Sequence, residues 1–322
     1  MKILTRTVCT LLLFISSNLI TAQNDVDAVV GDLLLIADEF ASPAASGAAY
    51  QASAGWFTSA QSLAPWKFEV SVHANGLIVP SSKKTSTIGN NELSLLNIKG
   101  ASNAKIPTAF GSTTDVYYEG NVMGNSFEFQ ALEGVDKGLV PHPFVQVTMG
   151  LPFESEFTLR ALPEMTIDDA NFSTFGAGIK HNFSQYFMFN EPEDLQVSAL
   201  ITYSKFDVKY AFDPVNIPQV AVLDLIDVNG DLWLFEALAS KRYEDFEIFG
   251  ALGATNSNFA YEMNGSGPFL GNINTALETL GENELQFKGD IGFNLYFDQF
   301  KVSTMVTAGS FFNMNLGLHF RI

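Results

Sequence analysis

The sequence predicts an all-β protein, an antiparallel transmembrane β-barrel of about 12–14 strands that follows an N-terminal helix and plug-like segment. Three observations support this fold class. Apolar and polar residues alternate up to the last residue, several other stretches of about 10–14 residues repeat the alternation, and aromatic residues gather at their ends. Strands of that length cross hydrocarbon at a tilt, whereas strands of soluble proteins commonly have about 5–6 residues. The barrel is therefore favoured over the alternative, a soluble β-sandwich.

Residues 1–22 have the parts of a secretory signal peptide. Lys2 and Arg6 give a positive start, an apolar run follows, and Ala22 is a small residue at a suitable cleavage point. The apolar run is too short to span a membrane as a helix. Cys9, the single cysteine of the sequence, lies inside this segment. We expect secretion with cleavage, and a mature chain without thiols or disulfides.

The mature chain is strongly acidic. Removal of residues 1–22 takes away two positive charges and no negative one, so the net charge moves from −18 to about −20. Binding to nucleic acid requires clustered Lys and Arg. Nucleic acid is therefore excluded as a partner.

Residues 23–65 are expected to form a helix and a plug-like segment before the barrel, which is assigned to 66–322. Within 25–40, apolar residues recur at helical spacing, which predicts a short amphipathic helix. The stretch 41–65 is rich in Ala, Ser and Gly and is expected to be irregular. An equally simple interpretation of 25–40 is a periplasmic helix that packs under the barrel.

From residue 66 the alternation has a period of two, so one face of each stretch is apolar and the other polar. It is clearest in 66–75, 195–204, 284–297 and 300–307. Weaker candidates are 91–99, 125–132, 143–150, 155–162, 172–182, 231–242 and 245–254. An open edge would leave unpaired backbone groups in lipid, so the strands must close into a ring.

Connections of two lengths separate these strands. The stretches 80–90 and 100–120 are rich in Ser, Thr, Asn and Gly, and 210–230 contains two prolines and is expected to form a loop. Residues 262–282 end in a short helical pattern, whereas Asp298-Gln299 is a very short turn. Short turns on one side and long loops on the other are typical of a transmembrane barrel.

The C-terminal strand has the strongest pattern. Its apolar residues alternate with polar or small ones and are Phe312, Met314, Leu316, Leu318, Phe320 and Ile322. It resembles the closing strand of bacterial outer-membrane barrels, which the barrel assembly machinery recognises as a C-terminal signal. That signal usually ends in Phe, whereas here the last Phe is third from the end. The resemblance implies an outer-membrane location, with outer-membrane lipid and the assembly machinery as partners.

Charged residues occur in mid-strand on the polar faces. A water-filled lumen accepts such charges, and lumen charges set the selectivity of a pore. The residues expected to line the lumen are Glu69, His73, Glu156, Arg160, Lys288 and Asp290.

Few motifs suggest catalysis. The four histidines lack paired metal spacing and no Gly-x-Ser-x-Gly is present. Residues 227–231 resemble the start of a calcium loop, but Gly230 is misplaced, and we interpret Asn229-Gly230 as a hairpin turn. We expect no enzyme activity, no metal and no cofactor. A barrel hydrolase stays open as an alternative if a serine and a histidine meet at the lipid boundary.

The segment before the first strand resembles two groups of barrels. Its Ala/Ser/Gly-rich tract is similar in architecture to the long-chain fatty-acid transporters of the outer membrane, in which an N-terminal hatch plugs the barrel. That family usually has Asn-Pro-Ala where this chain has Ser42-Pro43-Ala44, so no ligand-binding residue carries over. Gly55-Trp56 resembles more closely a set of uncharacterised outer-membrane barrels of Gram-negative, Bacteroidota-type bacteria.

We therefore expect a plugged channel or transporter for a small, hydrophobic molecule. Selectivity would depend on lumen polarity and on movement of the plug rather than on covalent chemistry. The alternative is a structural or adhesive outer-membrane protein without transport activity.

Overall fold

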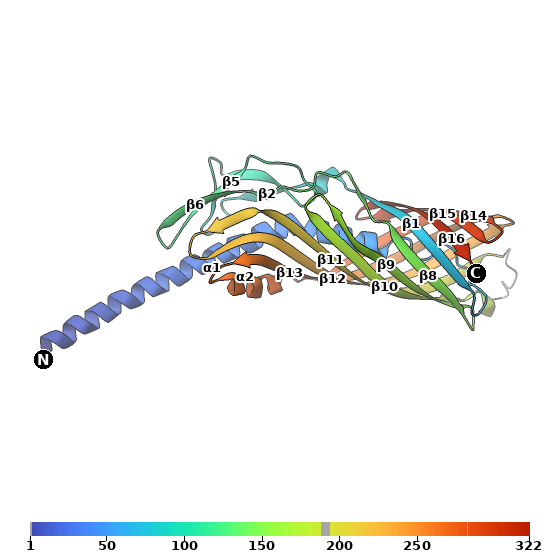
Figure 1. The fold of residues 1–322 in the computed structure, drawn as a ribbon, viewed down its shortest axis with the longest axis horizontal. Coiled ribbons are helices and arrows are strands. Elements are labelled where there is room, and N and C mark those ends of the chain that lie inside the picture. Colours follow the sequence, from blue (N-terminus) through green and yellow to red (C-terminus); the bar gives the residue numbers. More distant parts are fainter. Residues whose placement is uncertain (1, 188–193, 282) are drawn as a thin grey trace.

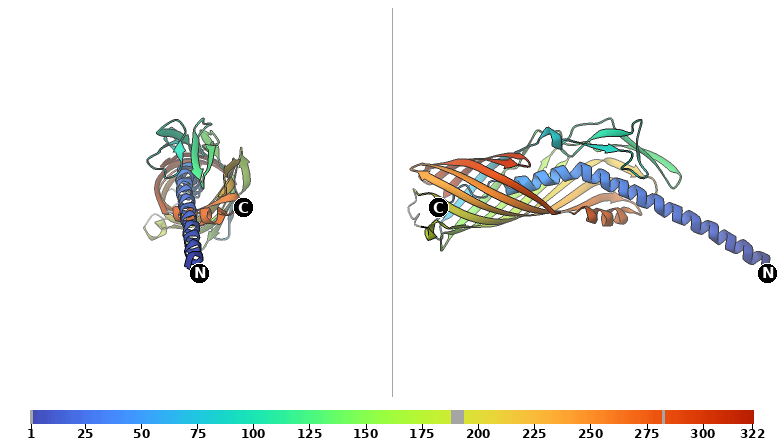
Figure 2. Two further views of the ribbon diagram at one scale, coloured as in Figure 1. Left: turned by 90° about the vertical axis from the view of Figure 1, so that its left-hand side faces the viewer. Right: turned by 180° about the vertical axis from the view of Figure 1, so that it is seen from behind.

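The computed structural model describes residues 2–187, 194–281 and 283–322, with side chains from residue 23 onward. An antiparallel sheet closes into a barrel, and a long helix enters it at the end opposite to the C-terminus (Figure 1). Seen along the barrel, the helix overlaps the ring of strands, and its N-terminal end extends beyond the outline of the ring (Figure 2). The predicted all-β barrel with a preceding helix is confirmed.

Ten strands close the barrel within the described residues. In order around the ring they are β1 (Phe68–Ile78), β8 (Phe144–Leu151), β9 (Ser155–Ile167), β10 (Ala170–Asn182), β11 (Gln196–Ile217), β12 (Ala221–Tyr243), β13 (Phe246–Ser266), β14 (Asn283–Phe297), β15 (Phe300–Gly309) and β16 (Phe312–Arg321). The ring closes because β16 pairs with β1, with Val70 opposite Phe320.

Ten is fewer than the expected 12–14, because two candidate strands lie outside the ring. Residues 91–99 and 125–132 belong to the insertion 79–138 between β1 and β7 (Leu139–Pro141). The insertion forms two small sheets of its own, from β2 (Thr85–Gly89) and β4 (Asn103–Pro107), and from β3 (Asn97–Ile98), β5 (Tyr117–Val122) and β6 (Asn125–Gln130). These strands are too short to cross a bilayer.

Apolar side chains form a belt around the outer face of the barrel. Its members are exposed large hydrophobic residues on neighbouring strands, and they include Phe68, Val70, Val72, Val145, Val147, Leu159, Phe175, Ile179, Trp233, Phe235, Ile248, Leu252, Phe287, Ile291, Phe293, Met314, Leu316 and Leu318. We call this surface the belt. A sheet that shows such a face to water would be costly, so the belt is the lipid-facing surface. No helix among the described residues is long and apolar enough to cross a membrane.

The apolar and polar faces of strand β11 change places where the strand leaves the belt. Up to Ser204 the polar side chains point inward, and the outward positions are apolar. Beyond it the outward residues are Lys205, Asp207 and Lys209, while Phe206 and Tyr210 are buried. Lipid outside and a polar lumen inside explain the first half, and water outside with an apolar core inside explains the second. The level of Ser204 therefore marks the edge of the bilayer.

Beyond the belt the molecule has a cap, which consists of residues 23–45, the insertion 79–138, the outer parts of β11–β13 and the short α2 (Leu270–Leu277). Helix α1 (Lys2–Ser53) packs there through one apolar face. The ring centres of Phe40 and Tyr210, for example, are 5.3 Å apart. The stretch 210–230, which was expected to be a loop, is the tip of the β11–β12 hairpin in this cap, and Asn229-Gly230 lies within β12 rather than at a turn.

Helix α1 is longer than the helix expected at 25–40. It continues through the Ala-rich stretch to Ser53, because alanine has the highest helix propensity and Pro43 does not end it. The irregular segment therefore begins only at residue 54.

The hydrogen bonding of the wall is broken between β8 and β9, toward the cap. Strand β8 pairs with β9 only as far as Val145 opposite Ala161, and β7 pairs with β1 alone. Residues 162–167 of β9 thus have no partner strand on that side among the described residues. Prolines at 141, 143 and 163, which lack the amide donor, flank this break.

Candidate functional site

The lumen is occupied by residues 46–65, which we call the plug. Helix α1 ends inside the barrel at Ser53, and the chain continues without regular structure toward β1. Gly55 follows the helix with a φ of 71°, in the left-handed region that favours glycine. A Cβ there would lie 2.8 Å from the side-chain amide nitrogen of Asn315, so the site excludes other residues by contact as well as by conformation.

Arg160 binds the C-terminal end of α1. Its Nη1 donates to the carbonyl oxygens of Ala52 at 3.2 Å and Ala54 at 2.8 Å. The guanidinium lies 4.0 Å from the ring centre of Trp56 and 3.9 Å from that of Phe144. A helix leaves its last carbonyls unpaired and carries partial negative charge there, so a cation is favoured.

Lys288 supplies a second cation at the same helix end. Its Nζ donates to the carbonyl of Ser53 at 3.0 Å and forms ion pairs with Glu236 at 2.7 Å and Asp290 at 2.9 Å. All three side chains are almost completely buried. The two carboxylates compensate the charge of a lysine that would otherwise be strongly disfavoured in this interior.

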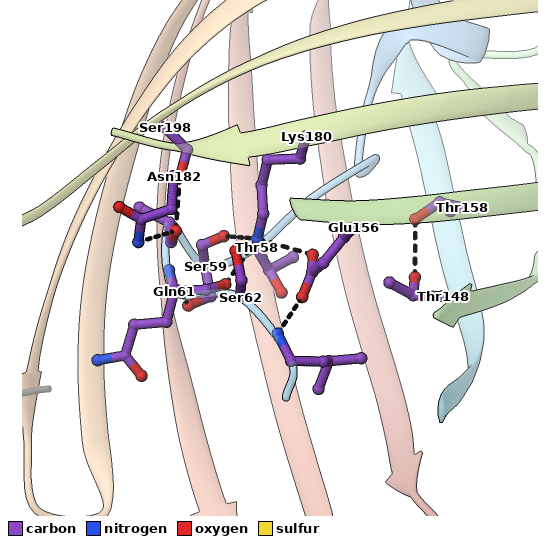
Figure 3. Close-up of polar contacts among 12 residues, drawn as sticks. Thr58, Ser59, Gln61, Ser62, Thr148, Glu156, Thr158, Lys180, Asn182 and Ser198 are labelled. Carbon is purple, nitrogen blue, oxygen red and sulfur yellow. Dashed lines mark hydrogen bonds and ion pairs between the residues drawn. The ribbon is translucent and has the colours of Figure 1, made fainter. Parts of the chain in front are cut away.

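Lys180 and Glu156 hold the part of the plug that follows (Figure 3). Lys180 Nζ donates to the carbonyls of Ser59 and Gln61, each at 2.7 Å, and pairs with Glu156 at 2.8 Å. Glu156 in turn accepts from the amide of Leu63 at 2.7 Å. The hydrogen bonds of this pair to the plug go to its main chain, and Lys180 Nζ also lies 5.2 Å from the ring centre of Phe57.

Neutral side chains of the wall supply further donors to plug carbonyls. Gln146 donates to Trp56, Asn294 to Thr58, and Asn182 and Ser198 to Ala60 (the last two in Figure 3). Buried backbone groups need such partners, and in this segment without regular structure many of them are side chains of the wall. The donors of the wall therefore match the carbonyls of the plug in the position that the plug occupies here.

All six residues expected to line the lumen are buried. Glu156, Arg160 and Lys288 contact the plug directly, and Asp290 acts through Lys288. His73 bonds instead to Asn315, at 3.0 Å from Nδ1 to Oδ1. Their effect on selectivity stays a prediction.

Glu69 forms a brace across the closure of the barrel. It binds Lys301 at 2.9 Å and Arg321 at 2.9 Å, and its Oε1 lies 2.7 Å from His319 Nδ1. His319 Nε2 lies 2.8 Å from Ser303 Oγ, which completes the order of bonds found in hydrolase triads. Ser303 is 0% exposed and lines neither cavity described below, so a substrate has no access to Oγ. The arrangement is inside the barrel rather than at the lipid boundary.

Two cavities lie at the two ends of the plug. The one near the C-terminal end of the barrel measures about 160 Å³ and is mostly polar, with Lys180, Lys301 and His319 in its lining. The other measures about 100 Å³ and is almost entirely apolar. It lies between α1 (Ala44, Ala48), the two sides of the break in the wall (Val140, Ile167, Phe172) and the inner faces of the cap (Phe110, Phe206, Tyr210). We call this second space the apolar cavity.

The sequence-based prediction missed several residues that hold the plug. Lys180, Glu236 and Asn294 are as buried as the predicted six, and each lies on the polar side of a predicted strand. Extending the alternation along those strands would have found them. Nothing in the sequence pattern pointed to the apolar cavity, because its lining comes from six separate segments. The described residues contain no group of three or more His, Cys, Asp or Glu side chains that could hold a metal ion.

Comparison with solved structures finds similar barrels at low identity. The chain is similar to the attachment invasion locus protein Ail of Yersinia pestis (8% identity, 80% of this chain and 100% of that chain, TM-score 0.29). It is also similar to the outer membrane protease OmpT of Escherichia coli (11%, 82% and 100%, 0.30) and to a FadL homologue of Pseudomonas aeruginosa (13%, 76% and 60%, 0.32). These similarities concern the fold alone. The search among curated proteins gave no match.

A family model provides the assignment. The model of DUF6588, described as a family of unknown function, matches residues 1–322. The expected Bacteroidota-type origin is not tested by this match and stays a prediction. The chain has the outer-membrane β-barrel fold, and it belongs to the DUF6588 family.

Proposed function

We propose that this chain is an outer-membrane channel that is closed by its plug and takes up a small apolar molecule at its capped end. In this proposal the signal peptide 1–22 is cleaved, the assembly machinery inserts the barrel through β16, and the cap faces outward. The long insertion lies in the cap, and long loops of such barrels lie outside the cell, which supports this orientation.

The apolar cavity is the observation that carries the proposal. Its lining combines Ala48 of α1 with Val140 and Ile167, which lie on the two sides of the break in the wall. A concave apolar space between elements is the common setting for a small-molecule site. Because the space touches α1, an occupant would contact the same helix that continues into the plug.

The contacts between the plug and the wall are of a kind that would let the plug move and open the lumen. Polar side chains of the wall hold it by individual hydrogen bonds and ion pairs, which water can replace when the lumen is wet. The six predicted residues would then line the open path and set its selectivity. This role for Glu69, His73, Glu156, Arg160, Lys288 and Asp290 is part of the proposal.

Uptake into cells tests this function. Cells would express the wild-type chain or Ala48→Leu, which fills the apolar cavity, at equal abundance in the outer membrane. Ala211→Leu, at an exposed position of β11, is the matched control. The initial rate of uptake of radiolabelled toluene should exceed that of cells without the barrel, and Ala48→Leu should remove most of the excess. Equal rates for Ala48→Leu and wild type would contradict the proposal.

A second candidate is a display or adhesion protein that transports nothing. The cap supports it, because β11, β12 and β13 have 22, 23 and 21 residues and extend well beyond the belt with a packed core of their own. In that case toluene uptake would not differ from that of cells without the barrel.

A further inference from the structure

A row of carboxylates along one side of helix α1 joins it to the insertion 79–138. The row comprises Asp25, Asp32 and Glu39, which are seven residues, or about two helical turns, apart. Asp32 is 2% exposed and accepts hydrogen bonds from three successive backbone amides of the insertion, at 94–96, over 2.7, 2.8 and 2.7 Å. Bonds to a charged acceptor are roughly twice as strong as neutral ones, so Asp32 fixes this part of the insertion to the helix.

The two other carboxylates extend the row over the outer part of α1. Asp25 accepts from the amide of Met123 at 3.2 Å, and Glu39 accepts from the hydroxyl of Ser86. Residues 23–40 are therefore held both by hydrogen bonds to the insertion and by the core of the cap, and we call them the clasped part. The apolar residues that this part contributes to the core include Val26, Val29, Val30, Leu33, Ile36 and Phe40.

Pro43 lies between the clasped part and the plug. A proline within a helix has no amide proton to bond to the carbonyl four residues earlier, here that of Glu39, and such positions are where helices bend. The helix changes direction as it enters the barrel (Figure 1 and Figure 2). Beyond Pro43 the insertion contacts α1 through apolar side chains, because Val79 and Phe110 pack with Tyr50.

The plug, in contrast, is bound by the wall of the barrel. Gln51 donates to the carbonyl of Val140 at 2.7 Å, and three cations of the lumen bind plug carbonyls as described above. Trp56 and Phe57 pack against apolar side chains of the wall. The polar contacts are of a kind that water can replace. The two parts of the N-terminal segment are thus attached to different parts of the protein, one to the cap and one to the wall, with Pro43 between them.

We propose that the channel opens by movement of the plug alone, with Pro43 as the hinge, while the clasped part stays bound to the insertion. This inference rests on the proposed function and adds which part of the chain moves. Movement of the whole helix would instead expose the apolar core of the cap to water and break the three bonds of Asp32. The outer surface of the cap therefore stays the same when the channel opens.

Reversible cross-links test the inference in the mature chain, whose sequence contains no cysteine once residues 1–22 are removed. The background variant is Lys180→Met/Glu156→Gln, which lacks the ionic contact with the plug and is expected to open. Openings are counted by single-channel recording in a planar bilayer, before and after each link is formed.

Two cysteine pairs are compared in this background. Asp25→Cys/Met123→Cys links the clasped part to the insertion, and Gln51→Cys/Val140→Cys links the plug to the wall. A short bis-methanethiosulfonate forms each link, mass spectrometry confirms it, and dithiothreitol removes it. The first link should leave the frequency of openings unchanged. The second should abolish the openings until dithiothreitol restores them.

The hinge has a test of its own. Pro43→Ala, in the same background without cysteines, supplies the missing amide donor and should make openings about tenfold rarer, because a continuous helix resists bending. An unchanged frequency of openings would overturn Pro43 as the hinge.

The outcomes separate this inference from the proposed function. Openings that are lost with either link would show that α1 moves as one piece, which overturns the inference and leaves the proposed function standing. Openings that persist with both links would show that the plug does not close the lumen. That result, or a background variant that never opens, would overturn the proposed function together with this inference.

Discussion

Lys180 and Glu156 lie 2.8 Å apart on neighbouring strands, and together they bind polar backbone groups of three alternate plug residues: the carbonyls of Ser59 and Gln61 and the amide of Leu63. The lysine serves the carbonyls and the carboxylate serves the amide (Figure 3). Because these contacts reach the main chain, they do not depend on the identity of the plug side chains. The pair is the clearest sign that the wall is built around this segment.

Lys180→Met should destabilise the barrel strongly. It leaves Glu156 buried without a counter-ion and removes the donor to two carbonyls, which costs about 3–5 kcal/mol of unfolding free energy. Lys205→Met, which breaks an exposed pair with Asp231, should cost less than about 1 kcal/mol. Urea unfolding in detergent measures both changes. Equal effects of the two substitutions would contradict the account of Lys180.

Two glycines of the N-terminal segment should respond in opposite directions to alanine. Gly55→Ala forces a Cβ into the left-handed region and against Asn315, and should lower the unfolding free energy by about 1–2 kcal/mol. Gly31→Ala adds a methyl group within α1 where no atom lies within 4 Å, and should raise it by about 0.5–1 kcal/mol. Thermal unfolding of both variants gives the comparison. A stabilising Gly55→Ala would show that the helix does not end as described.

An arginine in the belt should be far more costly than one above it. Ile291 is 63% exposed in the middle of β14, and Ile291→Arg places a charge in hydrocarbon, at about 2–4 kcal/mol. Ala260→Arg also points outward, but it lies beyond the belt on β13, opposite Asn229 and close to acidic residues, and should be nearly neutral. Unfolding in lipid vesicles is the measurement. If Ile291→Arg and Ala260→Arg lowered the unfolding free energy by similar amounts, the edge of the bilayer would not lie at the level of Ser204.

The two ends of the mature chain should be reachable from opposite sides of the membrane. Asp25 bonds to the amide of Met123 in the cap, whereas Arg321 pairs with Glu69 at the other end of the barrel. In a mature chain without native cysteine, Asp27→Cys should react with a membrane-impermeant maleimide on intact cells, as should Asn121→Cys in the insertion. Gln299→Cys, in the β14–β15 turn, should react only after the outer membrane is permeabilised. If Asp27→Cys and Gln299→Cys both reacted only after permeabilisation, the N-terminal helix would not pass through the barrel from one side of the membrane to the other.

The strands that the sequence predicted well keep one environment along their whole length. β1 and β16 have lipid on one side and the lumen on the other from end to end, so their alternation is constant. The same constancy explains why all six residues chosen from polar faces are buried. The same alternation of polar and apolar residues also predicts an inward position for the other side chains that hold the plug.

The features that the sequence did not predict arise where environments change. On β11 and β12 the apolar face moves from outside to inside at the edge of the bilayer, so the pattern near 210–230 looks like an apolar loop with two prolines. The number of strands was overestimated because the small sheets of the insertion alternate as barrel strands do. The apolar cavity depends on which distant segments meet, and periodicity carries no information about that.

Single-channel conductance of the full mature chain tests most directly the claim that residues 46–65 close the lumen. The wild type should show almost no steady conductance in a planar bilayer. The double variant Lys180→Met/Glu156→Gln removes the ionic grip on the plug without leaving an unpaired charge, and it should show frequent openings. A wild type that conducts steadily, with the double variant no different, would show that the plug does not close the barrel.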